Sequence, residues 1–378
     1  MVDVFKKITK TSDDELHTKF KLLRDEPTYY GARKIIEDWT NNFFDKDNKI
    51  IKEFQTTFHS SFWEFYLHSV FEAIGFKQNT ENNRPDFLVS SPEEIYIEAV
   101  VSEIKDSGRS ENERTQDDIF NNLLPISTQK EFSELIDEAI VRHSNSINSK
   151  LKKYTGYNVK NKWKSGYVDC TWVNKDRPYL IALASFDQIN YGKEYTYSME
   201  ALLYGMYYNP ETKTYTKRSS IKKPGTNSDI EIGIFNNPLM QDVSAVIFSN
   251  TLTLGKLSSL SKSNGDPSFQ SIINVRYCYD PPHYKIHEVE HDNPEHLLDG
   301  LYIFHNPNAK NKLSEDLLSQ SGLLQFTIDN HGIAMQGLHM PIVSRFCTPF
   351  KSLVEQFKAV AASEYNGVCA YEFKKNKT

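Results

Sequence analysis

Two acidic residues stand where a metal site can form. Asp86 follows Pro85 at the start of the apolar segment FLVSS, and Glu98 interrupts the apolar run IYIEAVV, with 11 residues between the two acids. Mg²⁺ prefers oxygen ligands, usually one or two carboxylates with water and phosphate oxygens. Glu64 is a candidate third ligand. The spacing predicts a site for a divalent cation, although each acid can also be read as a solvated surface charge.

The segments around these acids predict the elements that position them. Ser60–Phe76 has an apolar face at helical spacing and a stop signal at Gly75, which predicts a helix that carries Glu64. PDFLVSS and IYIEAVV read as two strands around a turn at Pro92. A long helix opened by a capping box is expected over Thr128–Tyr154, followed by the buried strand YLIALASF. An α/β core results.

The order helix-Glu64, Pro85-Asp86 and strand-Glu98 resembles the PD-(D/E)xK nuclease superfamily, which includes restriction endonucleases and phage-defence effectors. Several segments are similar in sequence to a group of bacterial proteins assigned to that superfamily. They are FWEFYLHSVFEAIGF, RPDFLV, IYIEAVV and, further along the chain, HNPNAKNKL. The resemblance covers residues 60–155. It implies a restriction-endonuclease-like αβββαβ core, with a central mixed sheet flanked by helices. It also implies hydrolysis of phosphodiester bonds with Mg²⁺ or Mn²⁺ bound by Asp86 and Glu98.

The superfamily's usual lysine, two residues after the strand glutamate, is replaced here by Val100. Some members supply this cation from the following helix. Lys150 and Lys153 lie on one side of that predicted helix, in a row with Arg142 and Ser146. We therefore expect Lys150 or Lys153 to act as the catalytic base or charge stabiliser. Lys105 is another candidate, and loss of catalysis through Val100 is a further possibility.

Lysines interleaved with aromatic residues predict a nucleic-acid surface. Residues 150–164 hold six lysines, three aromatics and no acid, and a second acid-free stretch, Thr212–Ser228, holds five basic residues. Such segments suit phosphate contacts and base stacking, although a solvated face is the competing reading. The residues expected to contact nucleic acid are Arg142, Lys152, Lys160, Lys162 and Lys164.

Composition limits the remaining possibilities. The chain of 378 residues is 39% hydrophobic and carries a net charge of −6, which excludes a uniformly basic nucleic-acid coat. No apolar stretch is long enough for a membrane helix and no secretory signal is present, so a cytoplasmic protein without membrane contact is expected. Four widely spaced cysteines predict reduced thiols. We expect a helical elaboration over residues 1–55, the nuclease core over 56–225 and a mixed α/β region of unassigned role over 226–378.

Competing motifs are weaker. His287-Glu288-Val289-Glu290-His291 matches HExxH, but alternating residues and flanking prolines predict an exposed strand, with His287, Val289 and His291 on one side, whereas a zinc protease needs a helix. No GxSxG elbow and no glycine-rich phosphate loop occurs, so any ATPase would be a separate partner protein.

The resemblance therefore implies a DNA endonuclease that acts in defence against foreign DNA. RNA as substrate, a homodimer and a separate defence partner remain open. The alternative is an inactive nucleic-acid-binding or scaffold protein on a nuclease fold.

Overall fold

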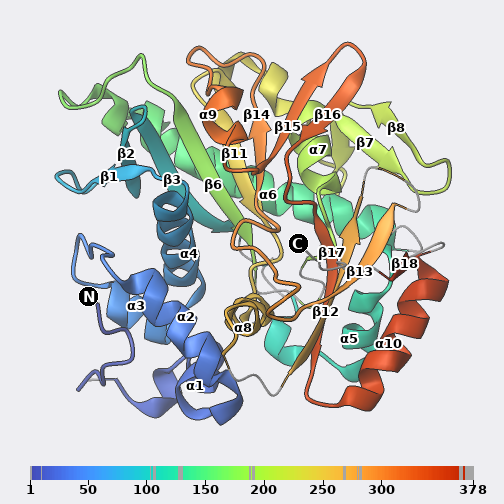
Figure 1. The fold of residues 1–378 in the computed structure, drawn as a ribbon. Coiled ribbons are helices and arrows are strands. Elements are labelled where there is room, and N and C mark those ends of the chain that lie inside the picture. The colour runs from blue at the N-terminus through green and yellow to red at the C-terminus, as the bar shows by residue number, and fades with distance from the viewer. Residues whose placement is uncertain are drawn as a thin grey trace.

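The computed structural model describes residues 2–370 except 10, 103, 105–107, 127–130, 187–188, 190–191, 267–269, 279, 281–282 and 366–368. Its centre is a mixed sheet with helices on both faces, so the protein belongs to the mixed α/β class (Figure 1). The sheet has eight strands in spatial order: β1 (Lys77–Asn79), β2 (Phe87–Ser91), β3 (Ile95–Ser102), β6 (Tyr179–Ser185), β11 (Ala245–Ser249), β14 (Tyr302–His305), β15 (Leu324–Asp329) and β16 (Gly332–Gln336).

The sheet mixes parallel and antiparallel pairs: β14 runs antiparallel to β11 and parallel to β15. β3 pairs in parallel with β6, and β6 with β11. β1 and β2 form an antiparallel edge beside β3, while β16 closes the other edge against β15. All seven residues of β6 are buried, as the continuous apolar run predicts for a strand covered on both faces. β1 is a polar strand that the sequence analysis missed.

One face of the sheet is covered by the N-terminal helices and two later ones. They are α1 (Thr18–Asp25), α2 (Tyr30–Thr40), α3 (Ile50–Thr56), α4 (His59–Ala73), α8 (Leu254–Ser263) and α9 (Glu315–Ser319). The indole nitrogen of Trp63 donates to the Ala182 carbonyl at 3.0 Å and so fixes α4 on β6. The predicted helix that carries Glu64 is therefore confirmed, and Gly75 adopts the positive φ of 81° that suits a helix end.

The opposite face is covered by α6 (Phe132–Thr155) and α7 (Tyr197–Tyr204). The ring of Tyr154 stacks on that of Tyr179 with centroids 4.0 Å apart, which holds the last turn of α6 over β6. The long predicted helix is confirmed over α6, although the proposed cap Thr128 lies outside the described residues. The α6 face and the α4 face have separate apolar cores.

A smaller sheet joins the large one near the C-terminus. Its strands lie in the order β17 (Ile342–Thr348), β12 (Ser271–Tyr277), β13 (Tyr284–Glu288) and β18 (Cys369–Ala370), with α5 (Gln116–Leu123) and α10 (Lys351–Glu364) beside it. Three hairpins complete the fold: β4 (Gly156–Val159) with β5 (Lys162–Ser165), β7 (Met206–Asn209) with β8 (Thr214–Lys217), and β9 (Ser220–Lys222) with β10 (Asp229–Glu231). No described helix combines the length and apolar content that a membrane crossing requires.

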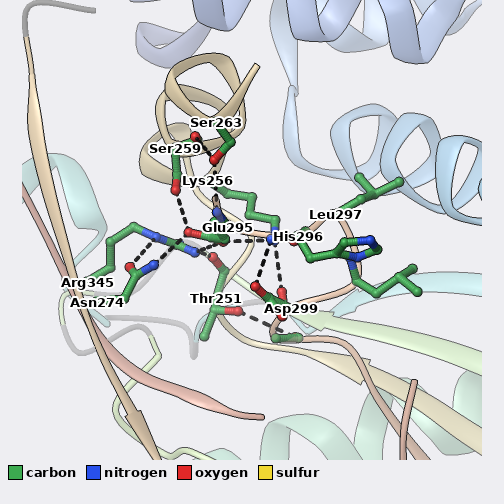
Figure 2. Close-up of polar contacts among 12 residues, drawn as sticks. Thr251, Lys256, Ser259, Ser263, Asn274, Glu295, His296, Leu297, Asp299 and Arg345 are labelled. Atoms are coloured by element: carbon green, nitrogen blue, oxygen red, sulfur yellow. Dashed lines mark hydrogen bonds and ion pairs between the residues drawn. The ribbon is translucent and has the colours of Figure 1, made fainter. Parts of the chain in front are cut away.

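Buried charges fasten the smaller sheet to α8. Glu295 accepts hydrogen bonds from Ser259 at 2.5 Å and from Asn274 at 2.8 Å, and it pairs with Lys256 at 2.8 Å and Arg345 at 2.5 Å (Figure 2). These partners come from α8, β12 and β17. The contacts tie three elements that are distant in sequence.

The sheet crosses the predicted boundary at residue 225. β6 precedes that residue and β11 follows it, yet the two strands pair over five residue positions. The N-terminal helices likewise share one core with α4 and with strands of the large sheet. The three predicted segments are thus packed together.

Candidate active site

Asp86 stands immediately before β2, beside the middle of β3. Its Oδ2 accepts a hydrogen bond from the Ala99 amide at 2.8 Å, which fixes the carboxylate next to Glu98. Burial by itself raises the pKa of Asp86, but the ammonium groups of Lys150 and Lys153 outweigh that effect and hold the pKa below its ordinary value. Asp86 is therefore ionised at neutral pH.

Glu98 is a charged side chain inside β3 and is completely buried. Its Oε2 lies 2.9 Å from Lys150 Nζ and 2.8 Å from Lys153 Nζ. Its Oε1 has no hydrogen-bonding partner among the described residues. A buried carboxylate oxygen without a partner carries a large desolvation cost, so this atom marks a place where a further cation or donor is favoured.

Lys150 bridges the two acids from α6. Its Nζ lies 3.1 Å from Asp86 Oδ2 as well as 2.9 Å from Glu98 Oε2. Burial disfavours the charged ammonium, but the two carboxylates outweigh it and raise the pKa of Lys150 above its ordinary value. Lys150 thus stays protonated beside the acids and cannot serve as a base in this arrangement.

The predicted row on α6 faces β3 along its whole length. Ser146 Oγ lies 3.5 Å from the Val101 carbonyl, and Arg142 Nη1 lies 3.2 Å from Ser102 Oγ. Arg142 is only 6% exposed, so the structure places it in the interior rather than on a nucleic-acid surface. Val100 lies in β3 and packs against the α6-side core. The alternative cation Lys105 lies outside the described residues.

Glu64 approaches Asp86 from the other side of the sheet. It belongs to α4, whereas Glu98 belongs to the strand positions that face α6. Burial and the nearby Asp86 carboxylate raise the pKa of Glu64 to about 8, so this carboxyl keeps its proton at pH 7. Glu64 therefore differs from Asp86 in protonation state although both lie at the same site.

Lys46 is a site residue that the sequence analysis did not identify. It lies between α2 and α3, and its Nζ donates to the carbonyl oxygens of Pro85 at 2.7 Å and Asp86 at 2.8 Å. Burial lowers the pKa of Lys46, and the charges of Asp86, Glu64 and Glu98 oppose that effect. In the sequence this lysine sits in the charged turn DKDNK, which reads as an ordinary solvated loop.

A cavity of about 340 Å³ opens beside Asp86. Lys46, Phe43 and Phe44 from the N-terminal segment line it, together with His68 of α4. His68 is held by contacts to Gln78 and to the Asn41 carbonyl. Asp86 therefore borders a pocket with both apolar and basic walls, whereas Glu98 is not part of its lining.

The remaining predicted nucleic-acid contacts are exposed. Lys152 lies on the outer side of α6, and Lys160, Lys162 and Lys164 lie on the β4–β5 hairpin directly after α6. Trp163 on the same hairpin is 57% exposed, and the Lys164 ammonium lies 5.5 Å from the centre of the Tyr157 ring. The hairpin thus presents cations and aromatic surface to solvent.

The HExxH sequence does not form a protease site. Residues 284–288 form β13, as the alternation predicts, but the prediction that its histidine side is exposed is wrong, because His287 and Val289 are buried. His287 contacts Arg276 at 2.8 Å and the Asn293 carbonyl at 2.9 Å. A zinc-protease motif requires a helix that brings both histidines to one face.

The donor chemistry of the acidic pair fits a divalent cation. Asp86 and Glu98 supply hard carboxylate oxygens, one of them without a partner, and the ammonium of Lys150 already lies between them. Within the described residues no three His, Cys, Asp or Glu side chains are grouped as a metal site, which agrees with Glu64 lying on the opposite side of the sheet.

Comparison with known proteins adds no assignment: no protein-family model, curated protein or solved structure matches the chain.

Proposed function

We propose that the protein is a metal-dependent nuclease that hydrolyses phosphodiester bonds, with DNA as the first expected substrate. One observation carries the proposal: two ionisable carboxylates, Asp86 and Glu98, share a lysine, and a buried oxygen of Glu98 remains unpaired among the described residues. In an ion pair with a purely structural role, an unpaired buried oxygen would add a desolvation cost without a compensating interaction.

The order of elements supports the family resemblance. α4, β1, β2, β3, α6 and β6 follow one another with α5 and the β4–β5 hairpin inserted, which is an αβββαβ sequence. Asp86 lies at the start of the second of these strands and Glu98 inside the third. The lysine absent at Val100 is supplied by α6, which places Lys150 Nζ 2.9 Å from Glu98 Oε2.

In this proposal Asp86 and Glu98 would hold Mg²⁺ or Mn²⁺. Such an ion lowers the pKa of bound water and neutralises phosphate charge. Lys150, which is protonated, orients the phosphate and stabilises the negative charge that develops on it. Glu64, whose pKa burial and the Asp86 carboxylate raise to about 8, would assist from the α4 face of the sheet. Lys46 positions Asp86 through its main chain.

The test is cleavage of supercoiled plasmid, linear duplex, single-stranded DNA and RNA with Mg²⁺, Mn²⁺ or EDTA. Wild type is compared with Asp86→Asn and with the control Asp169→Asn, which alters an exposed aspartate paired with Lys175. Metal-dependent cutting that is lost only in Asp86→Asn supports the proposal. Cutting that survives Asp86→Asn contradicts it.

An inactive binding protein is the second candidate, and a specific observation favours it. Lys150 already neutralises Asp86 and Glu98 in the described structure, and the hairpin with Lys160 and Lys164 is exposed. Gel shifts of DNA without cleavage under every metal condition would support this reading.

A further inference from the structure

A tyrosine-lined cavity lies far from the acidic pair along the large sheet. Its volume is about 610 Å³, within the usual range for small-molecule sites. Phe326 of β15 and Met335 of β16 contribute to its lining, whereas Asp86 adjoins β2. β15 and β2 are near opposite edges of the sheet, so the two sites are separate (Figure 1).

Two aromatic walls bound this cavity. The first comes from α7, the turn before it and the β7–β8 hairpin, and it contains Tyr195, Tyr197, Tyr208 and Tyr215. The second comes from β12, β13 and the end of α10, and it contains Tyr277, Tyr284 and Tyr365.

Ring contacts hold each wall together. Tyr197 stacks on Tyr208 with centroids 4.5 Å apart, and Tyr284 meets Tyr365 edge to face at 5.1 Å. Among the described residues no ring pair joins one wall to the other. Electron-rich ring faces that bound a cavity from two sides attract a cation placed between them.

The carboxyl group of Glu200, beside the first wall, also favours a cation. Glu200 is buried in α7, and Thr196 donates to its Oε1 at 2.6 Å. Its Oε2 has no hydrogen bond within 3.5 Å among the described residues. Burial outweighs the hydroxyls of Thr196 and Tyr215 and raises the pKa of Glu200 above its ordinary value, and no basic side chain is among these influences. This carboxyl lacks a cationic partner in the described structure.

The other charged residues that line the cavity do not provide an excess of positive charge to balance Glu200. Glu364 adds a second carboxylate to the lining, and Lys213 supplies one ammonium. His283 also lies in the lining, so the net charge of the cavity depends on Glu200, and a cation placed beside this carboxyl would favour its ionised form. An anionic nucleotide would gain stacking but meet unfavourable charge, whereas a cation is favoured by both the rings and the acids.

We propose that this cavity binds an organic cation, a substituted ammonium group inserted between the two tyrosine walls with Glu200 as its counter-charge. The group can belong to a free amine or to a methylated lysine side chain, which share this chemistry. The proposal does not depend on nuclease activity.

Calorimetric titration of the full chain with choline tests the proposal. The matched probe is 3,3-dimethyl-1-butanol, which has the same shape without the charge. We expect choline to bind at least about fivefold more tightly than the alcohol, in line with a cation–π contribution of about 1 kcal/mol. A peptide that carries trimethyl-lysine, titrated in parallel, distinguishes the two sources of the ammonium. Equal affinity for choline and the alcohol, or binding of AMP but not choline, overturns the proposal, as does the absence of choline binding.

Variants locate the site. Tyr208→Leu removes a ring face and should weaken choline binding about fivefold, whereas Tyr208→Phe keeps the face and should restore it. Glu200→Gln should also weaken binding, while Glu211→Gln, at an exposed position between β7 and β8, should not. Circular dichroism and thermal unfolding identify variants that fail to fold. Unchanged choline binding in folded Tyr208→Leu and Glu200→Gln would contradict the assignment.

Discussion

Two buried glutamates in this protein have similar cationic partners and opposite degrees of satisfaction. Glu295 has Lys256 and Arg345 on Oε1, and both Ser259 and Asn274 donate to its Oε2 (Figure 2). These contacts leave neither oxygen without a partner.

Glu98 has two lysines on Oε2 and no partner on Oε1 among the described residues. Its surroundings are also more open, since Lys153 is 36% exposed whereas the Arg345 side chain is 7% exposed. The difference shows that a buried ion pair is not informative by itself. Saturation of both oxygens is typical of a structural role, whereas the buried, unpaired oxygen of Glu98 is the feature that supports the proposed metal site.

The largest effect should come from breaking the saturated cluster. Glu295→Ala leaves Lys256 and Arg345 buried without their acid, and we expect it to lower the free energy of unfolding by about 3–5 kcal/mol. Glu98→Ala should cost about 1 kcal/mol or less, because Lys153 can reach water and Lys150 keeps Asp86. Urea unfolding of both variants measures the difference. Equal losses of unfolding free energy in the two variants would contradict the view that Glu295 is structural and Glu98 is not.

The cleavage rate should depend on Glu98, the residue whose replacement affects stability less than that of Glu295. Glu98→Gln keeps the shape of the side chain but loses the charge, and we expect the cleavage rate to fall at least about 10²-fold with an almost unchanged unfolding midpoint. Single-turnover cleavage with Mg²⁺ measures the rate. A Lys310→Gln variant, which alters an exposed pair with Asp242, serves as control. Full cleavage activity in Glu98→Gln would remove Glu98 from the proposed metal site.

The pH dependence of stability should differ in sign between acids of the two regions. The lowered pKa of Glu295, about 2, means that its charge stabilises the folded state fully above its ordinary value of 4.5 and that this gain is lost as pH falls toward 2. The raised pKa of Glu64, about 8, means that its neutral form favours folding and that this contribution is lost as pH rises from 4.5 to 8.

We therefore expect the stability of Glu64→Gln, relative to wild type, to increase between pH 4.5 and 8 and then level off. The advantage of wild type over Glu295→Gln should shrink below pH 4.5. Urea unfolding at several pH values gives both curves. A flat difference for Glu64→Gln would place the pKa of Glu64 near its ordinary value.

The smallest effect concerns the surface. Replacing Lys160, Lys162 and Lys164 with alanine should weaken DNA binding and reduce the slope of log K against log salt by about 0.9 for each lysine that contacts a phosphate of duplex DNA. The matched variant replaces Lys217, Lys222 and Lys223, which are exposed in the second basic stretch. Fluorescence anisotropy over a salt series measures both. A larger loss of DNA affinity on replacing the second set of lysines would assign DNA binding to that stretch instead of the β4–β5 hairpin.

Local patterns explain which parts of this site were predictable. The helical spacing of α4 and α6 and the alternation of β2 and β3 are properties of neighbouring residues, so Asp86, Glu98 and Lys150 could be placed on their elements from the sequence. Which face an element turns to its neighbours depends on tertiary packing. Arg142 shares a helix side with Lys150, yet it is buried against Ser102.

Long-range contacts were not predictable. Lys46 reaches Asp86 across 40 positions of sequence, and Arg345 reaches Glu295 across 50, without a motif at either end. β1 is a strand of three polar residues whose pairing with β2 determines its conformation. α2 ends at Thr40, just before Asn42 adopts a positive φ of 62°, and no glycine or proline in this segment marks that end.

The pairing of β6 with β11 has a practical consequence for anyone who shortens this chain. A fragment that stops at residue 225 would keep Asp86, Glu98 and Lys150 but would strip β6 of its parallel neighbour along five positions. The uncovered strand is apolar on both sides and its backbone groups are free to recruit another chain, which is the condition for edge-to-edge aggregation. A chain that carries the acidic pair therefore also needs the strands that follow residue 225 in order to fold without aggregation. This holds although Asp86, Glu98 and Lys150 all lie more than 200 positions before the C-terminus.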